Sequence, residues 1–383
     1  MHTMKVDTGH SGIHAIAICV LVIATGSIVA MPARASAWLP VTNATACTPG
    51  TWVQDTVETA PSEQTSFLNT AAVASPTLAW AVGFYGTGSK VESLIEKWSG
   101  GTSWSIVGTG GLNVVLQDVA AFGPNSAFAV GNIESTLTTN QQPVVTQWNG
   151  TSWVRTVLPT PTGAKAANLS YVTGSSSSDV WAVGVYLRNG IHPLVEHWNG
   201  STWTQVTMPS GVKPNAEAAG AVSVGDNDLW MDGSPDSLSG ARLWHYNGSW
   251  SIGPMPPSDG TMTGSSDHNL WMIGPYSSST GTPLEHFDGS RWTAIDRTTN
   301  TNIALDSIAL GASPSTVWTA GWSGITSSAM GTYIARDGLQ VTAPQVNGSL
   351  NGIGTGSGLA FAVGSRNIRN GLGRPIVLAG CDT

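Results

Sequence analysis

The sequence predicts an all-β protein, a seven-bladed β-propeller with four antiparallel strands per blade. Three observations predict this fold. A five-residue segment with an aromatic residue in second place recurs seven times along the 383 residues, at spacings of 41 to 53 residues. A second segment, in which a tight turn separates two aromatic residues, follows most copies of the first. Each repeat holds four short β-type segments and no helical periodicity, which is typical of a propeller blade.

The first segment is expected to be the second strand of each blade. Alternation along a strand places Trp181 and Val183 of VWAVG on one face of the sheet, and Ala182 on the other. A bulky face and a small face let each blade pack its tryptophan side against the small side of a neighbour. The copies are AWAVG at Trp80, AFAVG at Phe128, VWAVG at Trp181, LWMDG at Trp230, LWMIG at Trp271, VWTAG at Trp318 and AFAVG at Phe361.

The second segment is expected to be a hairpin that joins the third and fourth strands. An Asn-Gly or Asp-Gly pair supplies the positive φ angles of a tight turn. The flanking aromatic residues then face each other across the two strands, which contributes roughly 0.2 to 1 kcal/mol. We interpret the pair as structural; the alternative is an aromatic platform for sugars. Copies lie at 93–104, 143–153, 193–203, 241–250 and 283–292, with a degenerate copy at 331–341.

The N-terminus predicts export. Residues 1–37 combine a weakly charged leader, an apolar run and an ARASA sequence with cleavage sites after Ala35 or Ala37, as in a signal peptide. The alternative is an uncleaved anchor, because residues 13–31 are long enough to span a bilayer. Residues 38–46 form a short linker, and residues 47–383 form a single propeller domain. We expect a secreted or cell-envelope location, with no membrane insertion once the signal is removed.

The two chain ends complete one blade. The seventh repeat stops after its third strand, and the missing fourth strand is found at 47–57, where Trp52 matches Trp203. The N-terminal strand therefore closes the ring by completing the C-terminal blade. In this alignment Cys47 and Cys381 fall at the same hairpin, so we predict a disulfide between them. Cys19, the third cysteine, lies in the apolar run of the signal.

The composition limits the function classes. Charged residues make up 10% of the chain, there are 15 Lys and Arg, and the net charge is −8. Nucleic-acid binding depends on clustered Lys and Arg, so we expect no nucleic-acid partner. No zinc-type His/Cys spacing, phosphate-binding glycine loop or nucleophile elbow occurs in the mature chain, and we expect no cofactor and no metal. We expect a monomer.

Two sets of polar residues are candidate sites. Glu196 and His197 have equivalents in other repeats, whereas a catalytic pair would be unique to one blade, so we interpret them as structural. Asp118, Glu217 and Asp306 stand where first strands enter the ring, and we expect them to converge near the mouth of the central channel as binding residues. Such a set could hold a cation; the alternative is a hydrated channel lining.

The combination of WAVG with a hairpin ending in Trp resembles secreted bacterial propellers. These are the Asp-box repeat proteins related to sialidases, kelch-like propellers and the photosystem assembly-factor type. The chain departs from the Asp box because Asn199 and Gly200 are adjacent, and kelch Gly-Gly doublets are absent at repeat spacing. Sialidase-like chemistry would need arginines from several blades. Of the candidate arginines Arg188, Arg366, Arg369 and Arg374, three share one blade.

The expected function is therefore a non-catalytic binding or scaffold module that recognises a protein or glycan. Its variable face would be formed by loops such as 132–142, 185–192 and 365–374, which differ from blade to blade. The alternative is a glycan-active hydrolase or lyase with its site at the axial funnel. The resemblance does not choose between them, because propellers share architecture and not function.

Overall fold

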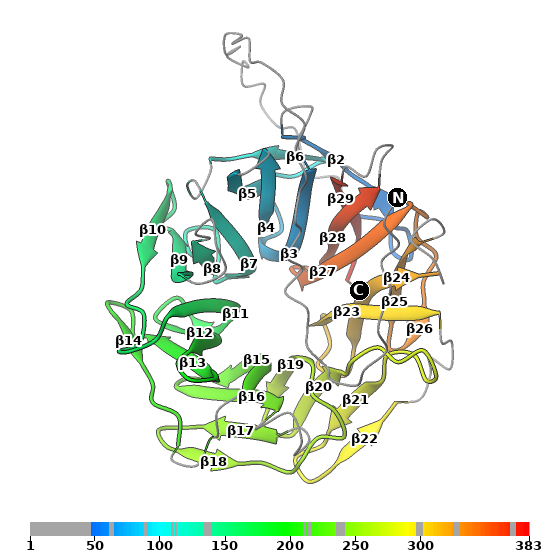
Figure 1. Ribbon diagram of the computed structural model, residues 1–383. Helices are drawn as coiled ribbons and strands as arrows, with labels where there is room; N and C mark the ends of the chain where they lie inside the picture. Colours follow the sequence, from blue (N-terminus) through cyan, green and yellow to red (C-terminus); the bar gives the residue numbers. More distant parts are fainter. Residues whose placement is uncertain are drawn as a thin grey trace, which may run out of the picture.

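The computed structural model forms a ring of seven β-sheets around a central channel (Figure 1). It describes residues 47–60, 65–87, 90–108, 111, 113–133, 140–209, 212, 216–234, 242–295, 302–324, 330–367 and 373–382. The predicted signal peptide and linker, residues 1–46, lie outside the described residues. Among the described residues there is no helix with the length and apolar character needed to cross a membrane.

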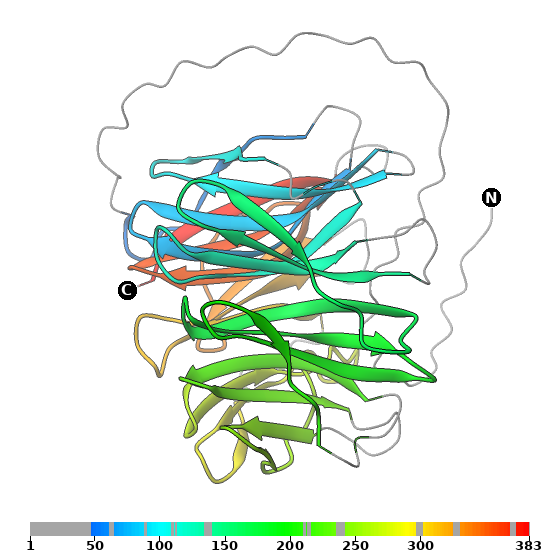
Figure 2. The same cartoon turned by 90° about the vertical axis from the view of Figure 1, so that its left-hand side faces the viewer.

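Each blade has the predicted order, with its first strand innermost and its fourth strand at the rim. Seen from the side, the strands run across the ring from one face to the other (Figure 2). Blade one contains β3 (Thr65–Ser75), β4 (Leu78–Thr87), β5 (Lys90–Trp98) and β6 (Ser103–Ile106); blade two β7 (Val114–Ala121), β8 (Ala127–Ile133), β9 (Gln142–Trp148) and β10 (Trp153–Val157); blade three β11 (Ala166–Ser176), β12 (Asp179–Leu187), β13 (Ile191–Trp198) and β14 (Trp203–Gln205).

The remaining blades follow the same plan, and the last uses both ends of the chain. Blade four contains β15 (Glu217–Gly225), β16 (Asp228–Ser234), β17 (Arg242–Tyr246) and β18 (Trp250–Ile252); blade five β19 (Thr261–Ser266), β20 (Asn269–Ile273), β21 (Leu284–Phe287) and β22 (Trp292–Ala294); blade six β23 (Ile303–Leu310), β24 (Val317–Ser323), β25 (Gly331–Arg336) and β26 (Leu339–Gln340); blade seven β27 (Gly348–Gly356), β28 (Leu359–Asn367), β29 (Gly373–Cys381) and β1 (Val53–Gln54).

The hairpin between third and fourth strands forms as predicted. In blade three, Trp198 pairs with Trp203 in register, and their ring centroids lie 5.8 Å apart. The side-chain Oδ1 of Asn199 accepts hydrogen bonds from the backbone N–H groups of Ser201 and Thr202, at 3.0 Å each. Gly200 has a φ of 92°, which favours glycine at this position. The aromatic pair and the turn chemistry therefore define one rigid unit.

Neighbouring blades pack bulky face to small face, as the alternation predicted. Trp80 of blade one is fully buried in a cluster with Ala127 and Ala129 of blade two. The sequence did not predict that the same ring also reaches the next hairpin, with centroids 4.8 Å from Trp148 and 5.0 Å from Trp153. Burying an indole removes about 150–250 Å² from water, worth about 4–6 kcal/mol per blade junction as an upper value.

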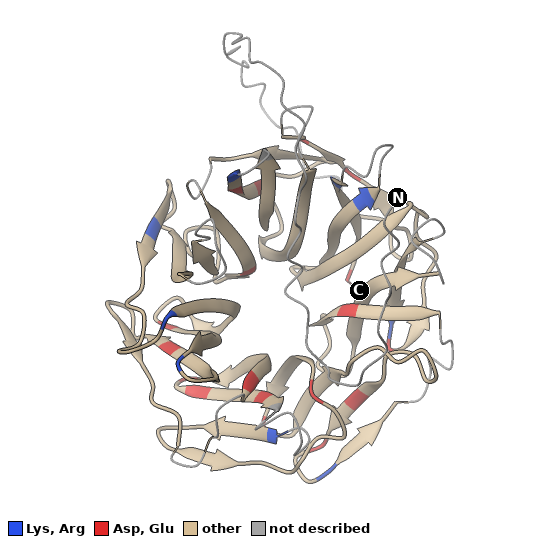
Figure 3. Ribbon diagram, in the orientation of Figure 1, with Lys and Arg blue, Asp and Glu red and all other residues tan. Residues whose placement is uncertain are grey.

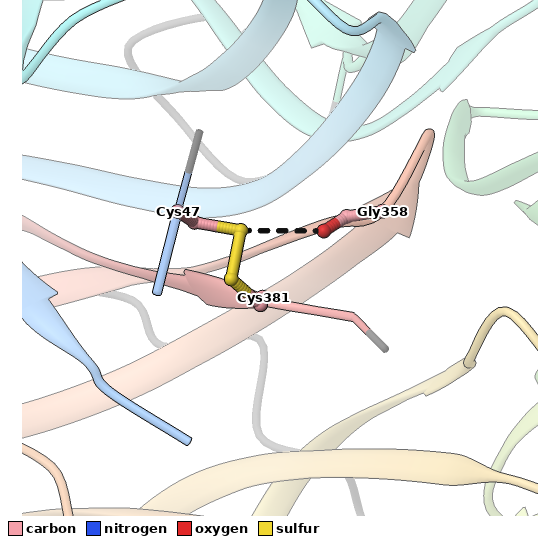
Figure 4. The surroundings of a disulfide bond; sticks show 3 residues. All are labelled: Cys47, Gly358 and Cys381. Atoms are coloured by element: carbon pink, nitrogen blue, oxygen red, sulfur yellow. Dashed lines mark hydrogen bonds between the residues drawn. A yellow bond between two sulfur atoms is a disulfide. The ribbon is translucent and has the colours of Figure 1, made fainter. Parts of the chain in front are cut away.

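The ring closes through the N-terminal segment and a disulfide. Val53 of β1 pairs with Ala379 of β29, which completes blade seven. Cys47 and Cys381 are bonded, with an S–S distance of 2.05 Å and Cα atoms 5.5 Å apart across 334 residues of sequence (Figure 4). One strand was not predicted: β2 (Thr56–Val57) pairs in parallel with β6, so blade one has a fifth strand.

Candidate functional site

The central channel is the main hollow of the ring. It has a volume of about 920 Å³ and is lined by the innermost strand of every blade, namely β3, β7, β11, β15, β19, β23 and β27. Most of the ribbon carries neither acidic nor basic residues (Figure 3), as the composition predicted. Among the described residues, the channel lining contains two carboxyl groups, Asp118 and Asp306, and no Arg, Lys, His or Glu.

A β-bulge recurs at the same place in six of the seven innermost strands. The bulged residues are Asn69, Gln117, Ser170, Ala219, Asp306 and Asn351. A bulge re-aims a side chain out of the regular alternation. Two of these side chains bridge to the next blade: Asn69 Nδ2 donates to the Leu116 carbonyl at 2.7 Å, and Asn351 Nδ2 to the Leu68 carbonyl at 2.9 Å.

Asp118 faces the channel, but backbone groups engage its carboxylate. Oδ1 accepts a hydrogen bond from the Val119 N–H at 2.9 Å, and Oδ2 accepts one from the Val172 N–H at 2.8 Å. Val172 belongs to β11, so the carboxylate joins blades two and three. Burial raises the pKa of Asp118 to about 6, although these N–H donors oppose the rise.

Asp306 is the other channel carboxyl, and it has no hydrogen-bonding partner among the described residues. It is exposed to the space of the channel and enclosed by the ring, and burial raises its pKa to about 7. Its position is fixed by its two neighbours. The N–H of Leu305 donates to Thr282 Oγ1 of blade five at 3.0 Å, and Ser307 Oγ accepts from the Ile353 N–H of blade seven at 3.1 Å.

Glu217 does not join these two residues. It is the first residue of β15, where it pairs with Ser234, and it is not part of the channel lining. The structure therefore brings Asp118 and Asp306 to the channel and leaves Glu217 at a strand start. Their role as binding residues stays a prediction.

An aromatic pair at the channel mouth was missed by the sequence analysis. Tyr276 follows β20, lines the channel and is 42% exposed. Its ring lies 5.8 Å from that of Trp322, which is in β24 opposite Ala304, two residues before Asp306. The connection that carries Tyr276 is folded tightly, because Ser277 and Gly281 exchange backbone hydrogen bonds. The sequence signal was a tyrosine five residues after the tryptophan of the second strand, a position that Tyr85 and Tyr186 share in blades one and three.

Glu196 and His197 have structural roles, as interpreted from their repeats. His197 Nε2 lies 2.6 Å from Asp179 Oδ1, and its ring stacks on Trp181 at 3.9 Å. Glu196 is buried, which raises its pKa to about 7. The same histidine arrangement recurs as His245 with Asp228 and as His286 with Asn269. A feature repeated in three blades belongs to the fold.

The candidate arginines do not gather at the channel. Arg188 donates through Nη1 to the Thr162 carbonyl, and Arg374 donates through Nη1 to the Ala60 carbonyl, at 3.2 Å each. Arg366 is exposed at the end of β28, and Arg369 lies outside the described residues. The described arginines therefore form no cluster that could hold a carboxylate substrate in the channel.

The predicted variable face is described only in part. Within 132–142 and 365–374, residues 134–139 and 368–372 lie outside the described residues. In 185–192, Tyr186 stacks on His192 at 5.1 Å, and the Arg188 guanidinium lies 5.5 Å from the Tyr186 ring. Tyr186 therefore has an aromatic and a cationic neighbour within its own loop.

Comparison with known proteins supports the fold. No protein-family model matches the sequence, and no curated protein matches it. Among solved structures, YCF48 from Cyanidioschyzon merolae is 15% identical, with 86% of this chain and 98% of that chain covered and a TM-score of 0.51. Pyrococcus horikoshii acylaminoacyl peptidase is 9% identical, with 83% and 52% covered and a TM-score of 0.53. The fucose-specific lectin from Aleuria aurantia is 15% identical, with 72% and 97% covered and a TM-score of 0.45. At 15% and 9% identity, the first two of these matches show a shared fold alone.

Proposed function

We propose that the protein is an exported, non-catalytic binding module whose ligand site is the channel mouth formed by Tyr276, Trp322 and Asp306. The observation that carries the proposal is that Tyr276, which is 42% exposed and in contact with the Trp322 ring, lines the same channel as Asp306, a carboxyl with no hydrogen-bonding partner among the described residues. Binding sites typically combine apolar or aromatic surface with a few convergent polar groups. Tyr276 comes from blade five, and Trp322 and Asp306 come from blade six.

The chemistry of this site suits a neutral polyhydroxylated ring, that is, a glycan. The apolar face of a sugar ring can lie on Tyr276 and Trp322, while Asp306 accepts hydrogen bonds from its hydroxyl groups. With a pKa of about 7, Asp306 is partly protonated at neutral pH, so it can also donate. No basic side chain lines the described part of the channel, so an anionic ligand would lack a counter-charge there.

Export is supported by two features. The N-terminal segment has the composition of a signal peptide, and the Cys47–Cys381 disulfide is typical of proteins that fold in an oxidising compartment. A hydrolase or lyase at the axial funnel finds less support. Of the two carboxyls that line the described channel, backbone N–H groups already hold one, which leaves Asp306 without a second acid or base beside it.

A glycan array probed with the purified protein tests this proposal. Glycans retained by the protein are then titrated against Tyr276→Ala and Asp306→Asn, and against His268→Ala as a matched control. His268 is exposed in the turn before β20, at the opposite end of that strand from Tyr276. We expect both mouth variants to bind at least tenfold more weakly and His268→Ala to bind like the native protein. Retention of no glycan, or equal binding by all three variants, would refute the proposal.

A further inference from the structure

Three metal-ligating side chains meet between blades four and five, at the opposite end of the strands from the channel mouth. Asp228 starts β16, His245 lies in β17, and Asp267 lies in the turn between β19 and β20. His245 Nε2 lies 2.9 Å from Asp228 Oδ1 and 3.8 Å from Asp267 Oδ1. The three ligating atoms all lie within 4.8 Å of one another. One histidine nitrogen and two carboxylate oxygens are therefore close enough to one another to share a single ion.

The preceding junction provides a comparison within the same chain. Between blades three and four, His197, Asp179 and Asp226 occupy the equivalent positions. There Ser175 Oγ lies 2.7 Å from Asp179 Oδ2 and 2.7 Å from Asp226 Oδ1, so a hydroxyl group sits between the two carboxylates. That junction already has its bridging group.

The junction between blades four and five lacks this hydroxyl. Val224 takes the place of Ser175, since each is the bulged residue before the turn of its blade. Valine cannot donate a hydrogen bond, so Asp228 and Asp267 face each other with only His245 between them. The following junction needs no bridge, because Asn269 replaces the aspartate and donates to the Pro314 carbonyl at 2.8 Å. Of these three junctions, only this one combines two carboxylates and an imidazole without a hydroxyl.

No basic side chain neutralises these carboxylates. Among the described residues, their only ion pairs are with His245, and no Lys or Arg lies within 4.0 Å of either. This local excess of negative charge favours a cation.

Trp230 holds two of the ligands in place. Its ring stacks on the His245 imidazole at 4.0 Å with an interplanar angle of 6°, and its indole N–H donates to Asp267 Oδ1 at 2.7 Å. Groups that orient metal ligands in this way commonly accompany genuine metal sites. Asp267 is 44% exposed, which leaves one side of the site open to water.

We infer that Asp228, His245 and Asp267 bind one divalent transition-metal ion of the zinc class. Zn²⁺ takes imidazole nitrogen and carboxylate oxygen at about 2.0–2.2 Å, and three protein ligands plus water complete its tetrahedral shell. An imidazole ligand disfavours Mg²⁺ and Ca²⁺, which prefer oxygen. Sequence spacing could not reveal the site, because its ligands come from two blades. The inference is independent of the glycan site, which lies on the other face.

Calorimetric titration of untagged, chelator-treated protein with Zn²⁺ tests the inference. We expect one equivalent to bind per chain and to raise the melting temperature. His245→Gln and Asp267→Asn should each weaken binding at least tenfold. Val224→Ser introduces a hydroxyl group at the position that Ser175 has in the preceding junction, and it keeps all three ligands. This variant should also weaken Zn²⁺ binding. The matched control is His197→Gln, which changes the equivalent histidine of the preceding junction and should leave Zn²⁺ affinity unchanged.

Three outcomes would overturn the inference. They are the absence of saturable binding, undiminished binding by Asp267→Asn, and equal loss of binding in His197→Gln. Asp267 is partly exposed, so Asp267→Asn decides the matter if circular dichroism shows that His245→Gln is unfolded. Ca²⁺ binding as tight as Zn²⁺ binding would also contradict the assigned metal class.

Discussion

The indole N–H of Trp104 donates to Asp55 Oδ2 at 3.0 Å, and this bond ties the N-terminal segment to the first blade. Asp55 lies between β1, which belongs to blade seven, and β2, which pairs with blade one. Its own N–H donates to the Val377 carbonyl at 3.0 Å. The residue is buried, and burial raises its pKa to about 6. Asp55 therefore sits at the seam where the ring closes.

Substitutions of Asp55 should distinguish the contribution of its hydrogen bond to stability from that of its buried charge. Asp55→Asn keeps an acceptor oxygen for Trp104 and removes a buried charge, so at pH 8 its free energy of unfolding should equal or exceed that of the native protein. Asp55→Ala leaves the indole N–H unpaired and should lower the free energy of unfolding by about 1–3 kcal/mol. Urea unfolding measures both. Identical midpoints for Asn and Ala variants would show that the bond does not contribute.

Removing the disulfide should destabilise the ring without changing its fold. The closed loop spans 334 residues, for which the chain-entropy model gives roughly 5 kcal/mol. The double variant Cys47→Ser, Cys381→Ser should therefore unfold at a lower urea concentration and keep its β-sheet circular dichroism. Non-reducing peptide mapping should first recover a Cys47–Cys381 cross-linked fragment. Recovery of both cysteines as free thiols would contradict the ring-closure account.

Stability should fall as pH rises from 4.5 to 8 because of Glu96. This side chain is fully buried, with no hydrogen-bonding partner for either carboxyl oxygen in the described part of the chain, and burial, with a smaller effect of Glu58, raises its pKa to about 8. A pKa that is higher in the folded than in the unfolded state means that stability is fully present below pH 4.5. It is then lost at up to about 1.4 kcal/mol per pH unit until the folded pKa is reached.

The variant Glu96→Gln tests this pH dependence, because an amide does not titrate. Its urea midpoint should rise relative to the native protein between pH 5 and pH 8. Glu196→Gln should show the same divergence, ending nearer pH 7, where its own pKa lies. If the native protein and Glu96→Gln followed parallel curves across this range, the carboxyl would be ionised when folded and the account of its burial would be wrong.

The pair Glu196 and His197 should matter for stability and not for ligand binding. Replacing them by Gln and Asn should leave the affinity for any retained glycan within a few-fold. His197→Ala should lower the free energy of unfolding by about 1–3 kcal/mol, because Oδ1 of Asp179 loses its partner and Trp181 loses its stacking contact. A folded double variant without glycan binding would reverse the structural interpretation.

The repeat made the fold predictable. Copies of the hairpin located the third and fourth strands of blades one to six, and alignment of Trp52 with Trp203 located the ring closure and the disulfide. The parallel β2 could not be predicted, because among the described sheets no other fourth strand is followed by a strand that pairs with the neighbouring blade. Its pairing depends on the neighbouring blade, which local sequence does not specify.

The candidate site was predictable only in part. Asp118 and Asp306 were found from their positions at first-strand entrances, yet sequence could not distinguish their roles. That distinction depends on a bulge and on which backbone N–H group of the next blade comes within reach. Tyr276 and Trp322 were missed because they lie 46 residues apart and meet only across a blade junction. Contacts between blades are what a single repeat cannot reveal.

The most direct test of the central claim is the pH dependence of glycan affinity, measured by calorimetry on the native protein and on Asp306→Asn. Ionised Asp306 accepts more hydrogen bonds from hydroxyl groups than its protonated form, so native affinity should rise between pH 6 and pH 8, around its pKa of about 7. Asp306→Asn should bind more weakly and show no such rise. An equal rise in both proteins, or undiminished affinity in Asp306→Asn, would place the ligand away from the channel mouth and contradict the account.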